Sequence, residues 1–378
     1  MVSKLKQLQN HKGFIKYFQN TSWLFAEKIL RLTVGLFIGV WVVRYLGPEQ
    51  FGVFSYVISF VAIFSTIATF GLDSIVIREL VIDESRRDEL IGTAFFLKLM
   101  GAFVVLAILS IAVNFTSNNT STNTLIFIIA SITIFKSFNV VDMYFQSKVL
   151  SKYVVYANVI SFVITSTVKI VLILNEAPLI AFAWVMLFDS FVLAIGFIYF
   201  FIKKNSTFNV KDLKFSKSTA VDLLRDSWPL MLSTVVISIY MKIDQVMIKE
   251  MMGPEAVGQY AAAVKLSEAW YFIPVVIASS LFPAIISAKK QSTELYYGRL
   301  QKLYNFVVWM AIAIALPMTF FGDWLVELLY GGRYNQAGSV LVIHIWAGVV
   351  VFFGTAWSKW MVSENQQLII MKLVKHQV

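Results

Sequence analysis

The chain carries ten apolar stretches, and each has about the 20 residues that an α-helix needs to cross the hydrocarbon core of a bilayer. The stretches run near 22–43, 51–70, 91–113, 124–146, 153–174, 178–202, 227–248, 256–288, 303–322 and 337–360. The eighth stretch exceeds the length of one span and contains Pro274 and Pro283, so a kink or break is expected there. None of the stretches alternates polar and apolar residues, which argues against membrane strands. The sequence therefore predicts an all-α membrane protein with about ten transmembrane helices.

Composition agrees with this fold class and excludes several functions. Hydrophobic residues make up 58% of the 378 residues and charged residues 14%, whereas a soluble domain averages about 45–50% and about 25%. Because the chain has no cysteine and three histidines, disulfides, thiolate metal sites and histidine-rich metal centres are not expected. The phosphate-binding pattern G-x-x-x-x-G-K-[ST] does not occur, and the longest outer loop, 114–123, has no acid or histidine that could serve in catalysis. We therefore expect neither an enzyme nor a bound cofactor.

The Lys and Arg residues predict how the helices are oriented. Cytoplasmic loops carry an excess of these residues, and the N-terminal segment has Lys4, Lys6, Lys12 and Lys16 without an acid. If this end is inside, the loops assigned inside hold 21 of the 32 Lys and Arg residues and the outer loops hold three. Both termini are then predicted to be cytoplasmic. The net charge of +10 is therefore largely a signature of orientation, and no nucleic-acid partner is expected.

A short repeat divides the chain. The sequence LGPEQFGVFSY at 46–56 matches MGPEAVGQYAA at 252–262, and each copy follows a span that opens with Ser-Trp. Since six spans separate the copies, both halves enter the membrane in the same direction, as in parallel-repeat transporters that work by alternating access. We predict a six-helix half over 1–202, a cytoplasmic linker over 203–226, and a four-helix half over 227–378 that is incomplete.

Charged side chains inside the predicted spans point to the cargo. A charge at the bilayer centre costs about 3 kcal/mol on insertion scales, so most of these residues are expected to face a hydrated cavity or to pair. The acids inside spans are Glu27, Asp189, Asp244 and Glu268. The cations that we expect to line a cavity for an anionic, phosphate-bearing substrate are Lys28, Arg31, Lys98, Lys136, Lys242 and Lys265.

Structural interpretations of these charges stay open. Lys169, Lys242 and Lys359 lie near span ends, where their side chains can reach the interface. Glu27 with Arg31, and Lys265 with Glu268, have the spacing of helical ion pairs, and Lys98 can also pair with an acid. The acids of loop 71–90 lie among three Arg residues, which is typical of a solvated helix that pairs with itself.

Eight segments together resemble a known family. They are LGPEQFGVFSY (46–56), GLDSIVIREL (71–80), DMYFQSK (142–148), SWPL (227–230), KIDQVMI (242–248), GPEAVGQY (253–260), PAI (283–285) and LYGGRYNQA (329–337). In this order and spacing, they resemble the Wzx-type polysaccharide flippases of the multidrug/oligosaccharidyl-lipid/polysaccharide exporter superfamily, whose fold is MATE-like.

The resemblance implies a flippase that carries undecaprenyl-diphosphate-linked oligosaccharide across the bacterial inner membrane for O-antigen or other surface polysaccharide. It implies coupling to an H⁺ or Na⁺ gradient, with Glu27, Asp244 and Glu268 as candidate coupling residues. A polysaccharide polymerase and a chain-length regulator are implied as partners. Family members usually have at least twelve spans, so the short second half is expected to be truncated or a functional short form. The alternatives are a multidrug or cation antiporter of the same superfamily and, from another class, a membrane glycosyltransferase or polymerase.

Overall fold

The computed structural model describes residues 12–204, 213–289 and 291–364, and the regular structure of this part is entirely helical. The α-helices are α2 (Lys12–Ser65), α3 (Leu72–Ile82), α4 (Arg87–Ala112), α5 (Thr120–Ala130), α6 (Ile132–Lys136), α7 (Val140–Ser147), α8 (Lys152–Leu174), α9 (Leu179–Lys204), α10 (Lys217–Met252), α11 (Pro254–Glu268), α12 (Phe272–Lys289), α13 (Thr293–Tyr330), α14 (Ala337–His344) and α15 (Ala347–Ser363). Short 3₁₀ segments are η1 (Ile67–Thr69), η2 (Glu84–Arg86), η3 (Val113–Phe115), η4 (Ser137–Asn139) and η6 (Gly332–Tyr334).

The predicted fold class and the approximate number of spans are confirmed. Among the described residues, nine helical stretches are long and apolar enough to cross a membrane. The first of them, Gln19–Ile82, contains the first two predicted spans, because α2 continues through a kink at Gly47. The other eight coincide one by one with the third to tenth predicted spans.

The expected break in the eighth span lies at residues 269–271, between α11 and α12. Pro274 falls in the first turn of α12, where a missing backbone N–H leaves no intrahelical hydrogen bond unmade. The tenth span is also interrupted, between α14 and α15, although its sequence contains no proline. A partly buried hydrogen bond links the helices that end at the two breaks: Ser267 Oγ of α11 lies 3.0 Å from His344 Nδ1 of α14.

The repeated Gly-Pro sequence forms the same turn twice. Gly47 has φ 70° and ψ 171°, and Gly253 has φ 92° and ψ 176°. These backbone angles are costly for every residue other than glycine, which explains why glycine stands at both positions. The proline that follows each glycine opens the next helical run, a position where its fixed φ is favourable.

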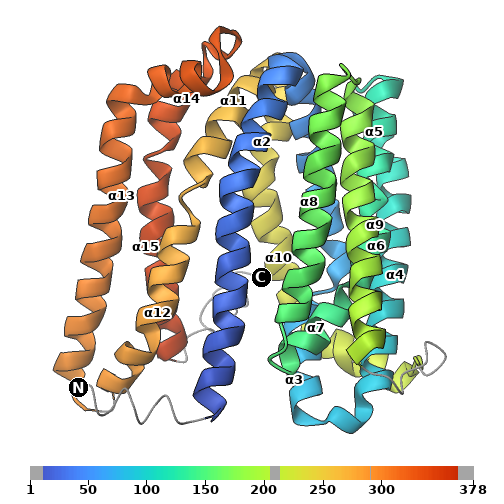
Figure 1. Cartoon of the computed structure of the whole chain (residues 1–378), viewed down its shortest axis with the longest axis vertical. Coiled ribbons are helices and arrows are strands. Elements are labelled where there is room, and N and C mark those ends of the chain that lie inside the picture. Colours follow the sequence, from blue (N-terminus) through green and yellow to red (C-terminus); the bar gives the residue numbers. More distant parts are fainter. Residues whose placement is uncertain (1–11, 205–212, 290, 365–378) are drawn as a thin grey trace. The chain divides into compact units, whose positions relative to one another are not determined.

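The chain forms two compact units, Met1–Val257 and Gly258–Val378. In the first unit α2 packs on α5, α8 and α10, and α8 packs along α9 (Figure 1). Its core gathers buried side chains of α3, α4 and α7, among them Leu72, Leu90 and Phe145. In the second unit α13 packs on α12, α14 and α15 around Leu303 and Phe352.

The predicted seventh span, α10, belongs by its packing to the first unit. Ser59 Oγ of α2 donates a hydrogen bond to Gln245 Oε1 at 2.9 Å, and both side chains are buried. At the other end of α10, Arg78 of α3 forms an ion pair with Asp226 at 2.5 Å. The proposed boundary between two halves at 203–226 remains a prediction about the repeat.

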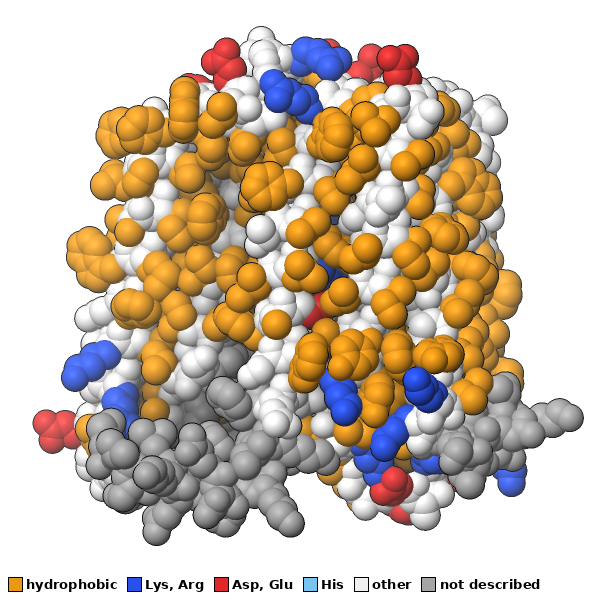
Figure 2. Space-filling model, viewed as in Figure 1, with side chains coloured by type: hydrophobic (Ala, Val, Ile, Leu, Met, Phe, Trp, Pro, Cys, Tyr) orange, Lys and Arg blue, Asp and Glu red, His pale blue; other side chains and the backbone are white. Residues whose placement is uncertain are grey.

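Hydrophobic side chains cover most of the face shown in Figure 2 along the middle of the helices. Lys, Arg, Asp and Glu gather at the ends of the helices on that face. An apolar band of this kind is stable against lipid chains and costly against water.

Candidate functional site

Acidic and basic side chains from seven helices of the first unit lie within electrostatic range of one another. We call them the interior charge network; its members are Glu27 and Arg31 (α2), Asp73 (α3), Lys98 (α4), Lys136 (α6), Asp142 (α7), Lys169 (α8) and Asp189 (α9). Four are cations and four are acids. Within membrane-spanning helices, such charges persist only where they pair or face a hydrated space.

Lys98 and Asp73 form the closest pair of the network. Lys98 Nζ lies 2.6 Å from Asp73 Oδ1, where α4 packs on α3. The lysine side chain is 6% exposed and the aspartate side chain 63% exposed. The aspartate therefore compensates a buried ammonium while much of its own side chain remains accessible.

Lys136 and Asp142 extend the network from this pair. Lys136 interacts electrostatically with Lys98, and Asp142 interacts with Asp73, Lys98 and Glu27. Lys136 is exposed, and in the described part of the chain it forms no ion pair. A cation beside a like charge and without a carboxylate contact is suited to receive an anionic ligand.

Arg31 occupies another part of the network on α2. Its Nη1 lies 3.3 Å from Glu27 Oε1, one helical turn away. The guanidinium also lies over the ring of Phe162 on α8, 5.5 Å from the ring centre. Arg31 and Lys169 are within electrostatic range of each other. The pair that the sequence suggested is therefore present, and it is held against a neighbouring helix.

Asp189 is fixed by hydroxyl groups of α8. Its Oδ1 accepts hydrogen bonds from Ser161 Oγ at 2.6 Å and Thr165 Oγ1 at 3.1 Å. Both hydroxyl residues are 2% exposed. Lys169 lies one turn beyond Thr165 and interacts electrostatically with Asp189 without a close ion pair. The polar stripe along α8 thus faces an acid of α9.

The remaining predicted residues lie elsewhere. Lys28 is exposed on α2 and forms no ion pair among the described residues. Lys242 and Asp244 are half-buried on α10, where Asp244 Oδ1 accepts from the backbone N–H of Gln245 at 2.8 Å. The other two, Lys265 (exposed) and Glu268 (half-buried), lie on α11 in the second unit.

The network also contains residues that the sequence did not single out as a site. Asp73 belongs to the segment that we expected to pair with itself, yet its partner Lys98 lies 25 residues further along the chain. Asp142 lies at the end of the fourth predicted span. Lys169 and Asp189 were visible as charges within spans, and the four-residue steps along α8 were the available signal of their shared face.

Comparison with known proteins gives a family and a fold. A family model described as "Polysaccharide biosynthesis protein" matches residues 17–289. A protein of Shigella dysenteriae named "Putative O-antigen transporter" is 23% identical over 250 residues, which cover 65% of this chain and 61% of that protein. The chain therefore spans less than two thirds of the length of this curated relative.

Solved structures of MATE transporters share the fold. An inward-facing multidrug resistance MATE family transporter of the MOP superfamily superimposes with a TM-score of 0.63 and 16% identity, over 88% of this chain and 83% of that one. A MATE structure in complex with MaL6 gives a TM-score of 0.60 at 15% identity, over 92% and 82% of the two chains. At this identity the likeness concerns the fold alone.

Proposed function

Because the chain belongs to the polysaccharide biosynthesis protein family and has a MATE-like fold, we propose that it is a flippase for lipid-linked oligosaccharide. Its substrate is an undecaprenyl-diphosphate-linked repeat unit, moved from the cytoplasmic to the periplasmic leaflet of a bacterial inner membrane. The family match over 17–289 is the observation that carries this proposal. The product serves O-antigen or another surface polysaccharide, consistent with the printed name of the Shigella relative.

The interior charge network gives the proposal a mechanism. The diphosphate enters beside Lys136, which has no carboxylate partner among the described residues. Lys98 then exchanges part of its contact with the exposed carboxylate of Asp73 for the phosphate. The bonds of Lys98 to carboxylate and to phosphate are both charge-assisted, so the exchange replaces one strong hydrogen bond with another of the same kind.

The acids of the network compensate its cations once the substrate has left. When the diphosphate leaves, Asp73 and Asp142 again compensate Lys98, so this buried ammonium does not remain unpaired in the low-dielectric interior. Coupling to an H⁺ or Na⁺ gradient is part of the proposal. Of the candidate coupling residues, Glu27 belongs to the network, whereas Asp244 and Glu268 lie outside it.

Purified protein in vesicles tests the function directly. Vesicles carry fluorescent undecaprenyl-diphosphate oligosaccharide in one leaflet, and a membrane-impermeant quencher reports the fraction exposed. We expect the protein, under an imposed ion gradient, to move the lipid between leaflets faster than protein-free vesicles do. Equal rates with and without the protein would remove the proposal.

The same protein-containing vesicles distinguish the proposed function from two alternatives. A multidrug antiporter is suggested by the printed title of one fold neighbour, and it would carry cationic dyes but not the lipid-linked glycan. A membrane glycosyltransferase or polymerase would form or break glycosidic bonds in the vesicles. We expect neither dye transport nor any change in the glycan chain, which chromatography of the recovered lipid measures.

A further inference from the structure

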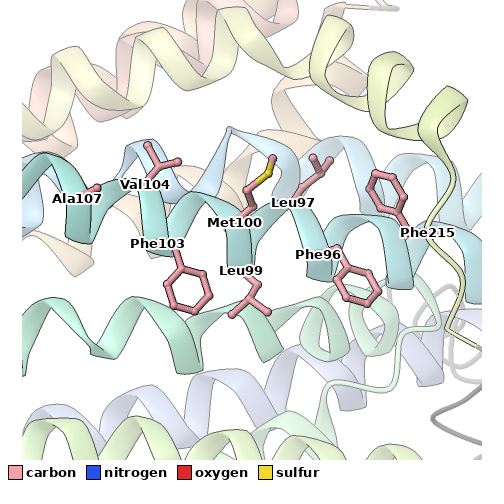
Figure 3. A pocket seen from close by; sticks show the side chains of 8 residues that line it. All are labelled: Phe96, Leu97, Leu99, Met100, Phe103, Val104, Ala107 and Phe215. Carbon is pink, nitrogen blue, oxygen red and sulfur yellow. The ribbon is translucent and has the colours of Figure 1, made fainter.

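An apolar groove runs along the outer side of α4. Side chains of α4 and one residue of the segment before α10 line it (Figure 3): Phe96, Met100, Phe103, Val104, Ala107 and Phe215. The groove has a volume of about 750 Å³, within the range of ligand-binding cavities. Met100, Phe103 and Phe215 are each more than half exposed, so the groove is open on one side. It lies away from the interior charge network, since Lys98 on the same helix is buried.

The segment 213–216, which precedes α10, closes one end of the groove. The segment before α10 runs directly against α4: a Cβ added to Gly92 would lie 2.7 Å from the backbone oxygen of Lys214. The backbone N–H of Ser216 donates to Thr93 Oγ1 at 3.1 Å. Between these two contacts, the ring of Phe215 packs edge-on against Phe96 with a centroid distance of 6.2 Å. Glycine at 92 is what permits this close approach.

The length of the groove fits one hydrocarbon chain. Phe96 and Ala107 are eleven residues apart, which corresponds to about 16 Å along a helix. A bilayer has a hydrocarbon core about 30 Å thick, so one leaflet contributes about half of that. The groove therefore has the depth of a single acyl chain, beginning at the end of α4 where the segment 213–216 attaches.

Charge at the walled end indicates the headgroup. Lys214 and Lys217 lie on either side of Phe215 in the sequence, and both are exposed. No acidic residue occurs between 213 and 221, and Glu89 of α4, whose carboxylate accepts a hydrogen bond from Thr219 Oγ1, is paired with Arg86. Lysines close to a membrane surface attract anionic lipid, and each contributes about a fivefold preference.

We infer that the α4 groove binds an anionic phospholipid of the bilayer, with one acyl chain along Phe96–Ala107 and its phosphate at Lys214 and Lys217. The bound chain covers apolar side chains that α4 presents beside Phe215. The phosphate and the two lysines hold the segment 213–216 on α4. This site differs from that of the transported lipid, whose diphosphate enters the interior charge network.

Photo-crosslinking of full-length protein in phosphatidylcholine vesicles tests the site. The probes are phosphatidylglycerol and phosphatidylcholine with a photoactivatable acyl chain, and mass spectrometry locates the labelled peptides. We expect labelling of 96–107 and of the peptide containing Phe215, with phosphatidylglycerol preferred over phosphatidylcholine by about fivefold or more. Equal labelling of these peptides by both lipids would overturn the inference. So would stronger labelling there by a photoactivatable polyprenyl phosphate.

Different substitutions test the position of the acyl chain and the position of the phosphate separately. Met100→Trp fills the groove and is expected to abolish the label, while Val163→Trp, at an equally exposed position (54%) on α8, keeps it. Lys214→Gln with Lys217→Gln is expected to bring the ratio of the two lipids close to one. Lys152→Gln with Lys302→Gln removes the same charge elsewhere and should leave the ratio unchanged. Unaltered labelling in Met100→Trp, with wild-type melting behaviour, would contradict the proposed position of the chain.

Discussion

Lys136 differs from the other cations of the interior charge network in what surrounds it. Arg31 and Lys98 each contact a carboxylate, and Lys169 faces Asp189, whereas Lys136 interacts with another lysine. Removing a paired cation leaves an acid uncompensated and destabilises the fold, so a loss of transport could then come from either cause. Lys136 therefore reports on substrate binding more cleanly than the other three.

We predict that Lys136→Gln slows flipping of the lipid-linked oligosaccharide by about ten- to a hundredfold, the equivalent of losing one hydrogen bond to a charged group. The rate in the vesicle assay measures this, and the melting temperature should stay close to that of wild type. Lys204→Gln is the matched control, because Lys204 is an exposed lysine at the end of α9 that was not predicted to line the cavity. Equal slowing by both substitutions would point to overall charge as the cause.

Substitutions of Asp189 test whether the network also stabilises the fold. Asp189→Ala removes the acceptor of two buried hydroxyls, Ser161 and Thr165, so we expect the free energy of unfolding to fall by about 1–3 kcal/mol. Asp189→Asn retains an acceptor oxygen and should lose less. Thermal unfolding in detergent compares the two. If the alanine variant were as stable as the asparagine variant, these hydrogen bonds would not stabilise the α8–α9 contact.

At the scale of helices, the turns between them decide which faces meet. Gly71 ends the second span with φ +66°, and a Cβ there would lie 2.6 Å from the backbone nitrogen of Met231 on α10. Both the backbone angle and the close approach exclude a side chain. One glycine therefore allows α3 to turn beneath the membrane helices and α10 to pack against it.

We expect Gly71→Ala to lower the free energy of unfolding by about 2 kcal/mol. Gly298→Ala is the control: Gly298 lies within α13, and a Cβ there meets no atom within 4 Å. Alanine at that position should leave stability unchanged or raise it by up to about 1 kcal/mol, because alanine favours helix. A Gly71→Ala protein as stable as wild type would show that the turn at 71 tolerates a side chain.

At the scale of the whole molecule, the repeat and the packing raise a question about α10. The repeat predicts that α10 opens the second half, at 227–378, whereas its contacts place it in the first compact unit. Alternating access requires the halves to move against each other. If α10 moves as part of the second half, its contact with α2 has to open during transport.

The absence of cysteine makes this testable. We predict that Ser59→Cys with Gln245→Cys, joined by a short thiol-reactive cross-linker, stops flipping, and that a cleavable linker restores it on reduction. These two side chains form a buried hydrogen bond between α2 and α10. The single cysteine variants treated in the same way are the control. Full transport by the cross-linked protein would mean that α2 and α10 move together.

Sequence alone predicted the helical class, the approximate number and positions of the spans, and the family, and it showed that the Gly-Pro sequence is repeated. These features are local: hydrophobicity along about 20 residues determines whether a segment crosses a bilayer, and glycine followed by proline determines a turn. The Glu27–Arg31 pair is local as well, since its members are one helical turn apart.

Only the tertiary structure decided which charges share a site. Asp73 contacts Lys98 across 25 residues, Ser161 contacts Asp189 across 28, and Ser59 contacts Gln245 across 186. Such contacts depend on how helices cross, and crossing depends on side-chain packing along their whole length, which a pattern read within one helix does not contain. The hydrophobic stretches therefore determined that this chain inserts into a membrane, and the packing of its helices determined which few charges inside it meet.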